Sequence, residues 1–123
     1  MTDLEKLIEA IEGEDAEEVK SLIRILTRDA VIDPDQNGWA NKAYRGSLDA
    51  AKALHEALLP EWSLERLTMW PGSKCHACLW GTHEEGGERW HSFEDGRVDA
   101  EAVTPARAWL LAILRAYATR GAA

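Results

Sequence analysis

The spacing of the apolar residues changes near Trp62 in this chain of 123 residues. Before Trp62, apolar residues recur every three or four positions, which is typical of helices with one buried face. From Trp62 to about residue 94 they recur at roughly every second position, which indicates short strands. The last stretch returns to the helical period. This pattern predicts an α+β fold with a sheet between helical segments.

Four helices and three strands are predicted. The helices are expected over about residues 2–12, 15–29, 48–59 and 105–119. Their starts carry capping signals, which are Thr2, Asp15, Ser47 and the pair Thr104-Pro105. The strands are expected over about residues 63–70, 74–81 and 88–94, joined by glycine-containing turns into an antiparallel meander. The predicted order is α-α-α-β-β-β-α, in a helix–sheet–helix layered domain.

A single domain is expected for residues 1–123, because no long linker divides the chain. Residues 1–30 are predicted to form acidic helices, 31–46 a loop, and 47–120 an α-β-β-β-α core. Within the loop, a set of four residues matches the start of a calcium loop: Asp33, Asp35, Asn37 and Gly38. Tyr44 stands where the closing glutamate is needed, so an ordinary turn is the simpler interpretation.

The net charge of −8 is concentrated at the N-terminal end. Residues 1–18 carry eight acidic residues and one lysine, whereas the other 105 residues carry 14 acidic and 13 basic ones. Such an end would repel a phosphate backbone, so nucleic-acid binding is not expected, and it would attract a basic protein. The candidate binding residues are Glu12, Glu14, Asp15, Glu17 and Glu18. The alternative is a solvated helix face that keeps the protein soluble.

Neither a signal peptide nor a membrane-spanning segment is expected, because the chain lacks the apolar run that each requires. We therefore expect a cytosolic protein without membrane contact. Cysteines in that compartment are more often free or metal-bound than joined in disulfides.

Both cysteines and three of the four histidines lie within Met69–Gly96. Cys75-x2-Cys78-x4-His83 reproduces three ligands of a zinc knuckle, and His91 is the candidate fourth ligand. A regular strand over 74–81 would place the two cysteines on opposite faces, where they cannot bind one ion. We therefore expect a strand with incidental cysteines and no cofactor, with zinc as the alternative.

The tryptophans of the predicted sheet allow two interpretations. Trp62, Trp70, Trp80 and Trp90 either form an exposed aromatic platform for a ligand or partner, or pack half-buried beneath helices. His55 is expected on a helix surface. No nucleophile with a base within reach and no glycine-rich phosphate loop is recognisable, so an enzyme is not expected.

Four short motifs point to a known family. They are Tyr44-x2-Ser47-Leu48-Asp49-Ala50-Ala51, Trp62-Ser63-Leu64, Ala77-Cys78-Leu79-Trp80 and Thr104-Pro105-Ala106-x-Ala108. Together they resemble the phage ABA sandwich domain family over about residues 3–119. The resemblance implies a helix–sheet–helix layered fold and a phage or prophage origin. It implies no established activity, cofactor or catalytic residue.

These observations lead to the expectation of a non-enzymatic phage or prophage accessory protein that binds another protein. In a sharper form, it inhibits a bacterial anti-phage defence system, as anti-CRISPR proteins do. Its carboxylates would then occupy the basic nucleic-acid groove of an effector. A small-ligand-binding protein and a zinc-stabilised module are the alternatives. The oligomeric state and the exposure of the sheet faces stay open.

Overall fold

The computed structural model describes residues 2–69, 74–85, 88–91 and 96–121, without the side chains of 82–91 and 119–121. The predicted α+β class is confirmed, as is a single small domain with an antiparallel sheet. The helices are α1 (Asp3–Glu12), α2 (Ala16–Arg28), α3 (Pro34–Tyr44), α4 (Leu48–Leu58) and α5 (Pro105–Gly121). The strands are β1 (Trp62–Thr68), β2 (Cys75–Glu85), β3 (Glu88–His91) and β4 (Arg97–Ala102).

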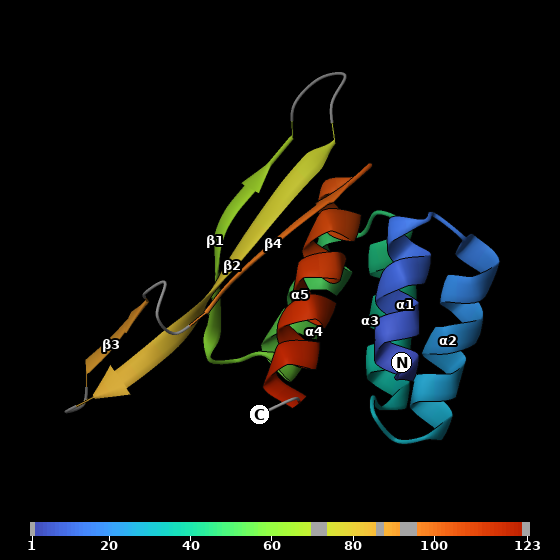
Figure 1. The fold of residues 1–123 in the computed structure, drawn as a ribbon, viewed down its shortest axis with the longest axis horizontal. Helices are drawn as coiled ribbons and strands as arrows, with labels where there is room; N and C mark the ends of the chain where they lie inside the picture. Colours follow the sequence, from blue (N-terminus) through green and yellow to red (C-terminus); the bar gives the residue numbers. More distant parts are fainter. Residues whose placement is uncertain (1, 70–73, 86–87, 92–95, 122–123) are drawn as a thin grey trace.

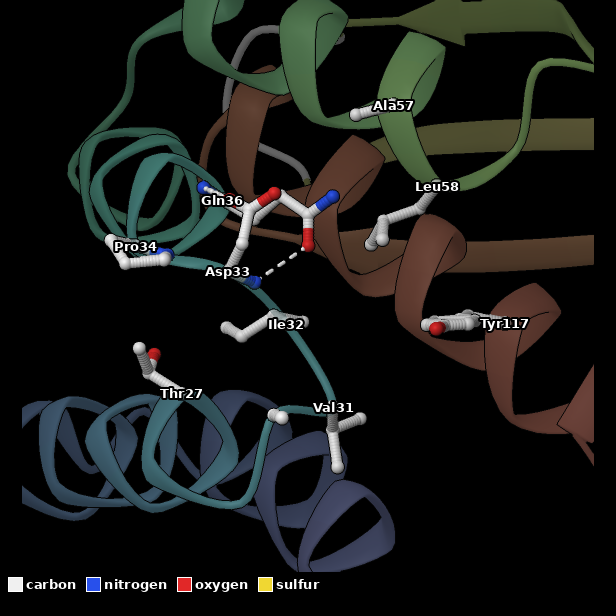
Figure 2. Close-up of a pocket in the computed structure, with 10 residues that line it drawn as sticks. Thr27, Val31, Ile32, Asp33, Pro34, Gln36, Ala57, Leu58 and Tyr117 are labelled. Atoms are coloured by element: carbon white, nitrogen blue, oxygen red, sulfur yellow. Dashed lines mark hydrogen bonds between the residues drawn. The ribbon is translucent and has the colours of Figure 1, made fainter.

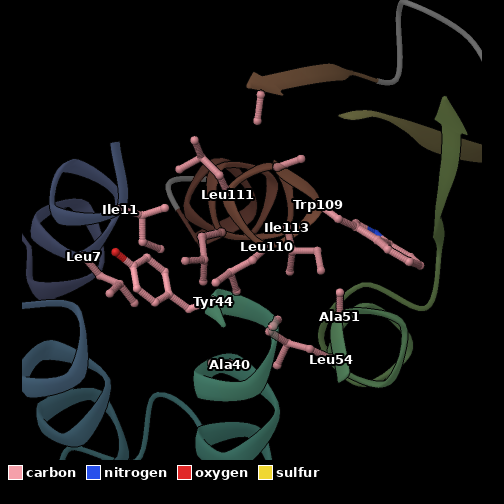
Figure 3. Packing of buried hydrophobic residues seen from close by; sticks show 14 of the residues in the cluster. Leu7, Ile11, Ala40, Tyr44, Ala51, Leu54, Trp109, Leu110, Leu111 and Ile113 are labelled. Carbon is pink, nitrogen blue, oxygen red and sulfur yellow. The ribbon is translucent and has the colours of Figure 1, made fainter. Parts of the chain in front are cut away.

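Helix α5 forms the centre of the core. Its sequence is apolar on nearly every side, and a helix of this kind is stable only when it is buried all round. Accordingly, α5 lies between the sheet and the helices α1, α3 and α4 (Figure 3). Its buried residues are Ala106, Ala108, Trp109, Leu110, Leu111, Ala112, Ile113, Leu114 and Ala116. The small alanines allow neighbouring elements to approach closely.

Strand β2 organises the sheet. Its first half pairs with β1 on one side and with β4 on the other, and its second half pairs with β3. The predicted neighbours β1, β2 and β3 are therefore confirmed. In Figure 1, β3 and the end of β2 extend away from the helices as a two-stranded arm.

The two faces of the sheet have different surroundings. Cys75, Ala77 and Leu79 of β2 belong to the core, on the face toward α5. The alternate residues His76, Cys78 and Trp80 lie on the other face, which we call the open face. All five helices lie on the same side of the sheet (Figure 1). Within the described ranges, no helix covers the open face. The helix–sheet–helix order therefore holds along the chain. The helices before the strands and the helix after them nevertheless lie on the same side of the sheet.

The prediction of a loop over 31–46 is wrong, because Pro34–Tyr44 is helical. Asp33 caps this helix by accepting from the backbone nitrogen of Gln36 over 2.8 Å, and the Gln36 side chain accepts from the Asp33 backbone nitrogen in return. Pro34 suits the first helical position because it has no N–H to satisfy. Since Asp33 serves as a cap and Asn37 lies within the helix, these residues do not form a calcium loop.

The predicted meander also omits β4. This strand alternates between Val98, Ala100 and Ala102 on the core side and charged residues on the open face. It pairs antiparallel with β2 from Cys75↔Ala102 to Trp80↔Arg97. The third strand beside the first half of β2 is therefore β4, and β3 pairs farther along.

Candidate functional site

The five predicted acidic residues lie together around the turn between α1 and α2, and all are exposed. We call Glu12, Glu14, Asp15, Glu17 and Glu18 the acidic turn. The two helices pack side by side, on the far side of α5 from the sheet (Figure 1). The structure thus brings the predicted residues into one exposed surface.

Two members of the acidic turn have structural roles. Asp15 caps α2, since its Oδ1 accepts from the backbone nitrogen of Glu18 over 3.2 Å. Glu12 accepts from Nη2 of Arg115 on α5 over 2.8 Å. Among the described residues, Glu14, Glu17 and Glu18 make no ion pair. Three carboxylates are therefore available to an external cation, although Glu17 and Glu18 also suit the positive end of the α2 dipole.

Arg115 connects the acidic turn to the sheet. Its Nη1 donates to the backbone oxygen of Asp99 on β4, over 2.6 Å, while Nη2 holds Glu12. A polar hollow of about 500 Å³ lies at this junction, lined in part by His76 and Lys74. The acidic turn therefore adjoins a mixed-charge edge of the sheet.

Asp99 is the centre of the charged network on the open face. Its Oδ1 accepts from Nε2 of His76 over 2.9 Å, and its Oδ2 accepts from Nε of Arg97 over 3.0 Å. Partial burial acts to raise the pKa of the Asp99 carboxyl, but hydrogen bonds from Arg97 and His76 outweigh it. The pKa therefore lies below its ordinary value, and Asp99 is held as a carboxylate.

The predicted zinc ligands are not assembled by the described structure. Cys75 lies in the core, where its Sγ is 3.9 Å from the backbone oxygen of Val103. Cys78 lies on the open face, where it lines a small hollow together with Arg97. Two thiols on opposite faces of one strand cannot bind the same ion. The side chains of His83 and His91 lie outside the described residues.

Of the two interpretations of the tryptophans, a shared platform does not hold for Trp62 and Trp80, because they lie on opposite faces of the sheet. In the β1–β2 register Trp62 pairs with Gly81, and Trp80 pairs with Ser63. Trp62 therefore lies on the core side, where it packs against the buried cluster, while Trp80 lies on the open face. Trp70 lies outside the described residues, as does the side chain of Trp90.

His55 is buried, contrary to its predicted place on a helix surface. Its Nε2 lies 2.8 Å from the backbone oxygen of Trp62, and its Nδ1 accepts from Nε1 of Trp109 over 3.0 Å. The sequence contained a signal for this position. Ala51 lies four residues before His55 and Leu58 three residues after it, which places His55 on a buried stripe of α4.

A hollow of about 770 Å³ lies between the α2–α3 connection and the ends of α4 and α5 (Figure 2). Its polar groups already have local partners. Asp33 and Gln36 hydrogen-bond each other, and the Thr27 hydroxyl donates to Ile23 and accepts from Asn37. This hollow therefore offers a ligand few unengaged polar groups.

None of the helices in the described ranges has the length and apolar character needed to cross a membrane. No protein-family model, curated protein or solved structure matches the chain. The resemblance to the phage ABA sandwich domain family therefore stays a prediction.

Proposed function

We propose that this protein is a non-enzymatic binding protein that contacts a basic protein partner through its acidic turn. The observation that supports the proposal is the exposure of Glu14, Glu17 and Glu18 without an ion pair among the described residues. Charges of one sign on one surface speed the approach of an oppositely charged partner and orient it. Residues 19–123 are nearly neutral, with 14 acidic and 13 basic residues, so the N-terminal end that contains this surface carries most of the net negative charge.

A sharper form of the proposal concerns a phage or prophage accessory role. Carboxylates arranged over two adjacent helices can stand in for the phosphates of a nucleic acid. The partner would then be a basic effector of a bacterial defence system, and binding would block its nucleic-acid groove. Competition with DNA or RNA for the purified effector tests this form.

The direct test neutralises the three available carboxylates together, as Glu14→Gln, Glu17→Gln and Glu18→Gln. Candidate partners are purified basic nucleic-acid-binding proteins of bacteria, titrated by calorimetry at low and physiological salt. We expect binding to weaken by about tenfold or more and to lose most of its salt dependence.

A matched control removes the same charge elsewhere, as Asp35→Asn, Asp49→Asn and Glu65→Gln. Asp35 and Asp49 lie in the first turns of α3 and α4, as Glu17 and Glu18 do in α2. The control should bind like the wild type. Equal affinity of the acidic-turn variant and the wild type would overturn the proposal.

A further inference from the structure

A groove of about 370 Å³ lies between α4 and β1, with α5 contributing to its lining. We call it the Trp62 groove. Its apolar walls are Pro60, Trp62, Leu64 and Trp109, and His55 also lines it. The volume is within the range of small-molecule sites, which are mostly apolar with a few polar groups. The groove is separate from the acidic turn.

The polar atoms of the groove floor are engaged with one another. His55 uses Nδ1 for the Trp109 N–H and Nε2 for the backbone oxygen of Trp62. The rings of His55 and Trp109 meet edge to face, with centroids 5.8 Å apart. Residues of α4 and α5 thus form an aromatic floor, in which the side-chain nitrogens of His55 and Trp109 already have partners. Such a floor recognises a ligand through ring contact.

Gly96 lies close to the Trp62 ring. A Cβ atom at Gly96 would lie 3.2 Å from Cη2 of Trp62, so the indole depends on the missing side chain there. Trp62 remains half-buried. Part of this wall therefore stays accessible.

The charges at the groove cancel. Lys52 and Glu56 line it, with Nζ 4.0 Å from Oε1, and both side chains are about two-thirds exposed, at 68% and 67%. An exposed pair of this kind is weak, so either residue can turn to a ligand. A ligand with net charge would leave one of the two without a partner. The pair therefore favours a neutral or zwitterionic occupant.

We propose that the Trp62 groove binds a planar aromatic ring of about indole size that carries no net charge. The ring contacts the tryptophan and leucine walls, and its polar substituents meet Lys52 and Glu56. A free aromatic amino acid and an aromatic side chain of a peptide both present this chemistry.

The first experiment titrates the full chain with indole and follows the indole N–H signals of Trp62 and Trp109 by NMR. We expect saturable shifts of both signals. In Leu64→Glu, which places a carboxylate in the apolar wall, the affinity should fall by about tenfold or more. In the matched control Thr68→Glu, on the same strand but on the open face, it should stay within about twofold.

An absence of saturable shifts, or full affinity in Leu64→Glu, would overturn the proposal. If Leu64→Glu does not fold, nuclear Overhauser contacts between indole and the Leu64 methyl groups in the wild type decide the question. Their presence supports the proposed site, and their absence removes it.

Two further probes separate the sources of the ring. N-acetyl-tryptophanamide imitates a side chain within a peptide, and L-tryptophan is the free zwitterion. Tighter binding of L-tryptophan that is lost in Lys52→Ala supports a free amino acid, and tighter binding of the amide supports a peptide. Indole-3-acetate, which is an anion, should bind more weakly than both. Equal binding of this anion would contradict the charge selection.

Discussion

Nε1 of Trp109 donates a hydrogen bond to Nδ1 of His55 over 3.0 Å, and Nε2 of the same imidazole lies 2.8 Å from the backbone oxygen of Trp62. Because Nδ1 accepts, Nε2 is the nitrogen that donates, and these partners select one tautomer. A single side chain of α4 thus joins α5 to the start of β1. This contact fixes where the sheet begins relative to the helices.

We expect His55→Ala to lower the free energy of unfolding by about 2–4 kcal/mol, because it creates a cavity and leaves the Trp109 N–H without its partner. Urea unfolding followed by tryptophan fluorescence measures the change. Lys52→Ala on the exposed side of the same helix is the control, with an expected change within about 0.5 kcal/mol. A loss below about 1 kcal/mol for His55→Ala would show that the two hydrogen bonds contribute little.

Much of the fold follows from local sequence signals. The helical period and the caps at Thr2, Asp15 and Ser47 locate α1, α2 and α4 to within a few residues. The separation of Cys75 and Cys78 follows from strand alternation alone. The acidic turn can also be predicted from the sequence, because two short helices joined by a brief turn keep acidic residues that are close in sequence close in space.

The missed elements depend on weaker or non-local signals. Helix α3 is rich in turn-forming residues, and its buried face consists of Ala40, Ala43 and Tyr44, which give a weak apolar period. Strand β4 is composed largely of alanine and acidic residues, which have low strand propensity. It becomes a strand through its pairing with β2. The opposite positions of Trp62 and Trp80 follow from the β1–β2 register, which the sequence does not fix.

We expect Asp33→Ala to lower the free energy of unfolding by about 1 kcal/mol, because α3 loses its N-cap. Thermal and urea unfolding measure the effect. The same carboxylate would be a ligand if this segment bound calcium. Added Ca²⁺ should leave the wild-type melting temperature unchanged, and a clear increase that disappears in Asp33→Ala would contradict the capping role.

The stabilising effect of Asp99 should depend on pH. Partial burial raises the pKa of this carboxyl, but hydrogen bonds from Arg97 and His76 bring it below the ordinary value of 3.8. A group with a lowered pKa in the folded state stabilises the fold above its unfolded-state pKa. That stabilisation disappears as the pH falls through the folded-state pKa. Asp99→Asn should therefore be less stable than the wild type at about pH 5 and approach it below about pH 4.

Urea midpoints of the wild type and Asp99→Asn across this pH range measure the convergence. Arg97→Gln removes the strongest partner of the carboxylate. Its stability should therefore also approach that of the wild type as the pH falls. A difference between wild type and Asp99→Asn that stays constant with pH would mean that the Asp99 charge does not contribute to folding.

The pair of Glu12 and Arg115 tests how firmly the acidic turn is joined to the sheet. Both side chains are partly exposed, so a double-mutant cycle with Glu12→Gln and Arg115→Gln should give a coupling of about 0.2–1 kcal/mol. Arg115→Gln alone should cost more than Glu12→Gln, because it also removes the donor to the Asp99 backbone oxygen. Equal costs would show that the contact with β4 is not stabilising.

Alanine substitutions at three glycines distinguish the cost of backbone strain from the cost of a new side-chain contact. Gly38 lies inside α3, and a methyl group added there would have no heavy atom within 4 Å, so Gly38→Ala should stabilise the protein by about 0.5–1 kcal/mol. Gly46 and Gly96 both have a φ of +111°, where an alanine is strained, at a cost of about 1–3 kcal/mol. Only at Gly96 would the new methyl group also press on Trp62.

Gly96→Ala should therefore be more destabilising than Gly46→Ala, and the difference measures the contact with the Trp62 ring. Urea unfolding of the three variants gives the free energies, and the NMR signal of the Trp62 indole N–H reports whether the ring moves. We expect this signal to shift in Gly96→Ala and not in Gly46→Ala. If Gly96→Ala and Gly46→Ala lose equal stability and the Trp62 signal does not shift, the added methyl group at Gly96 does not press on the Trp62 ring.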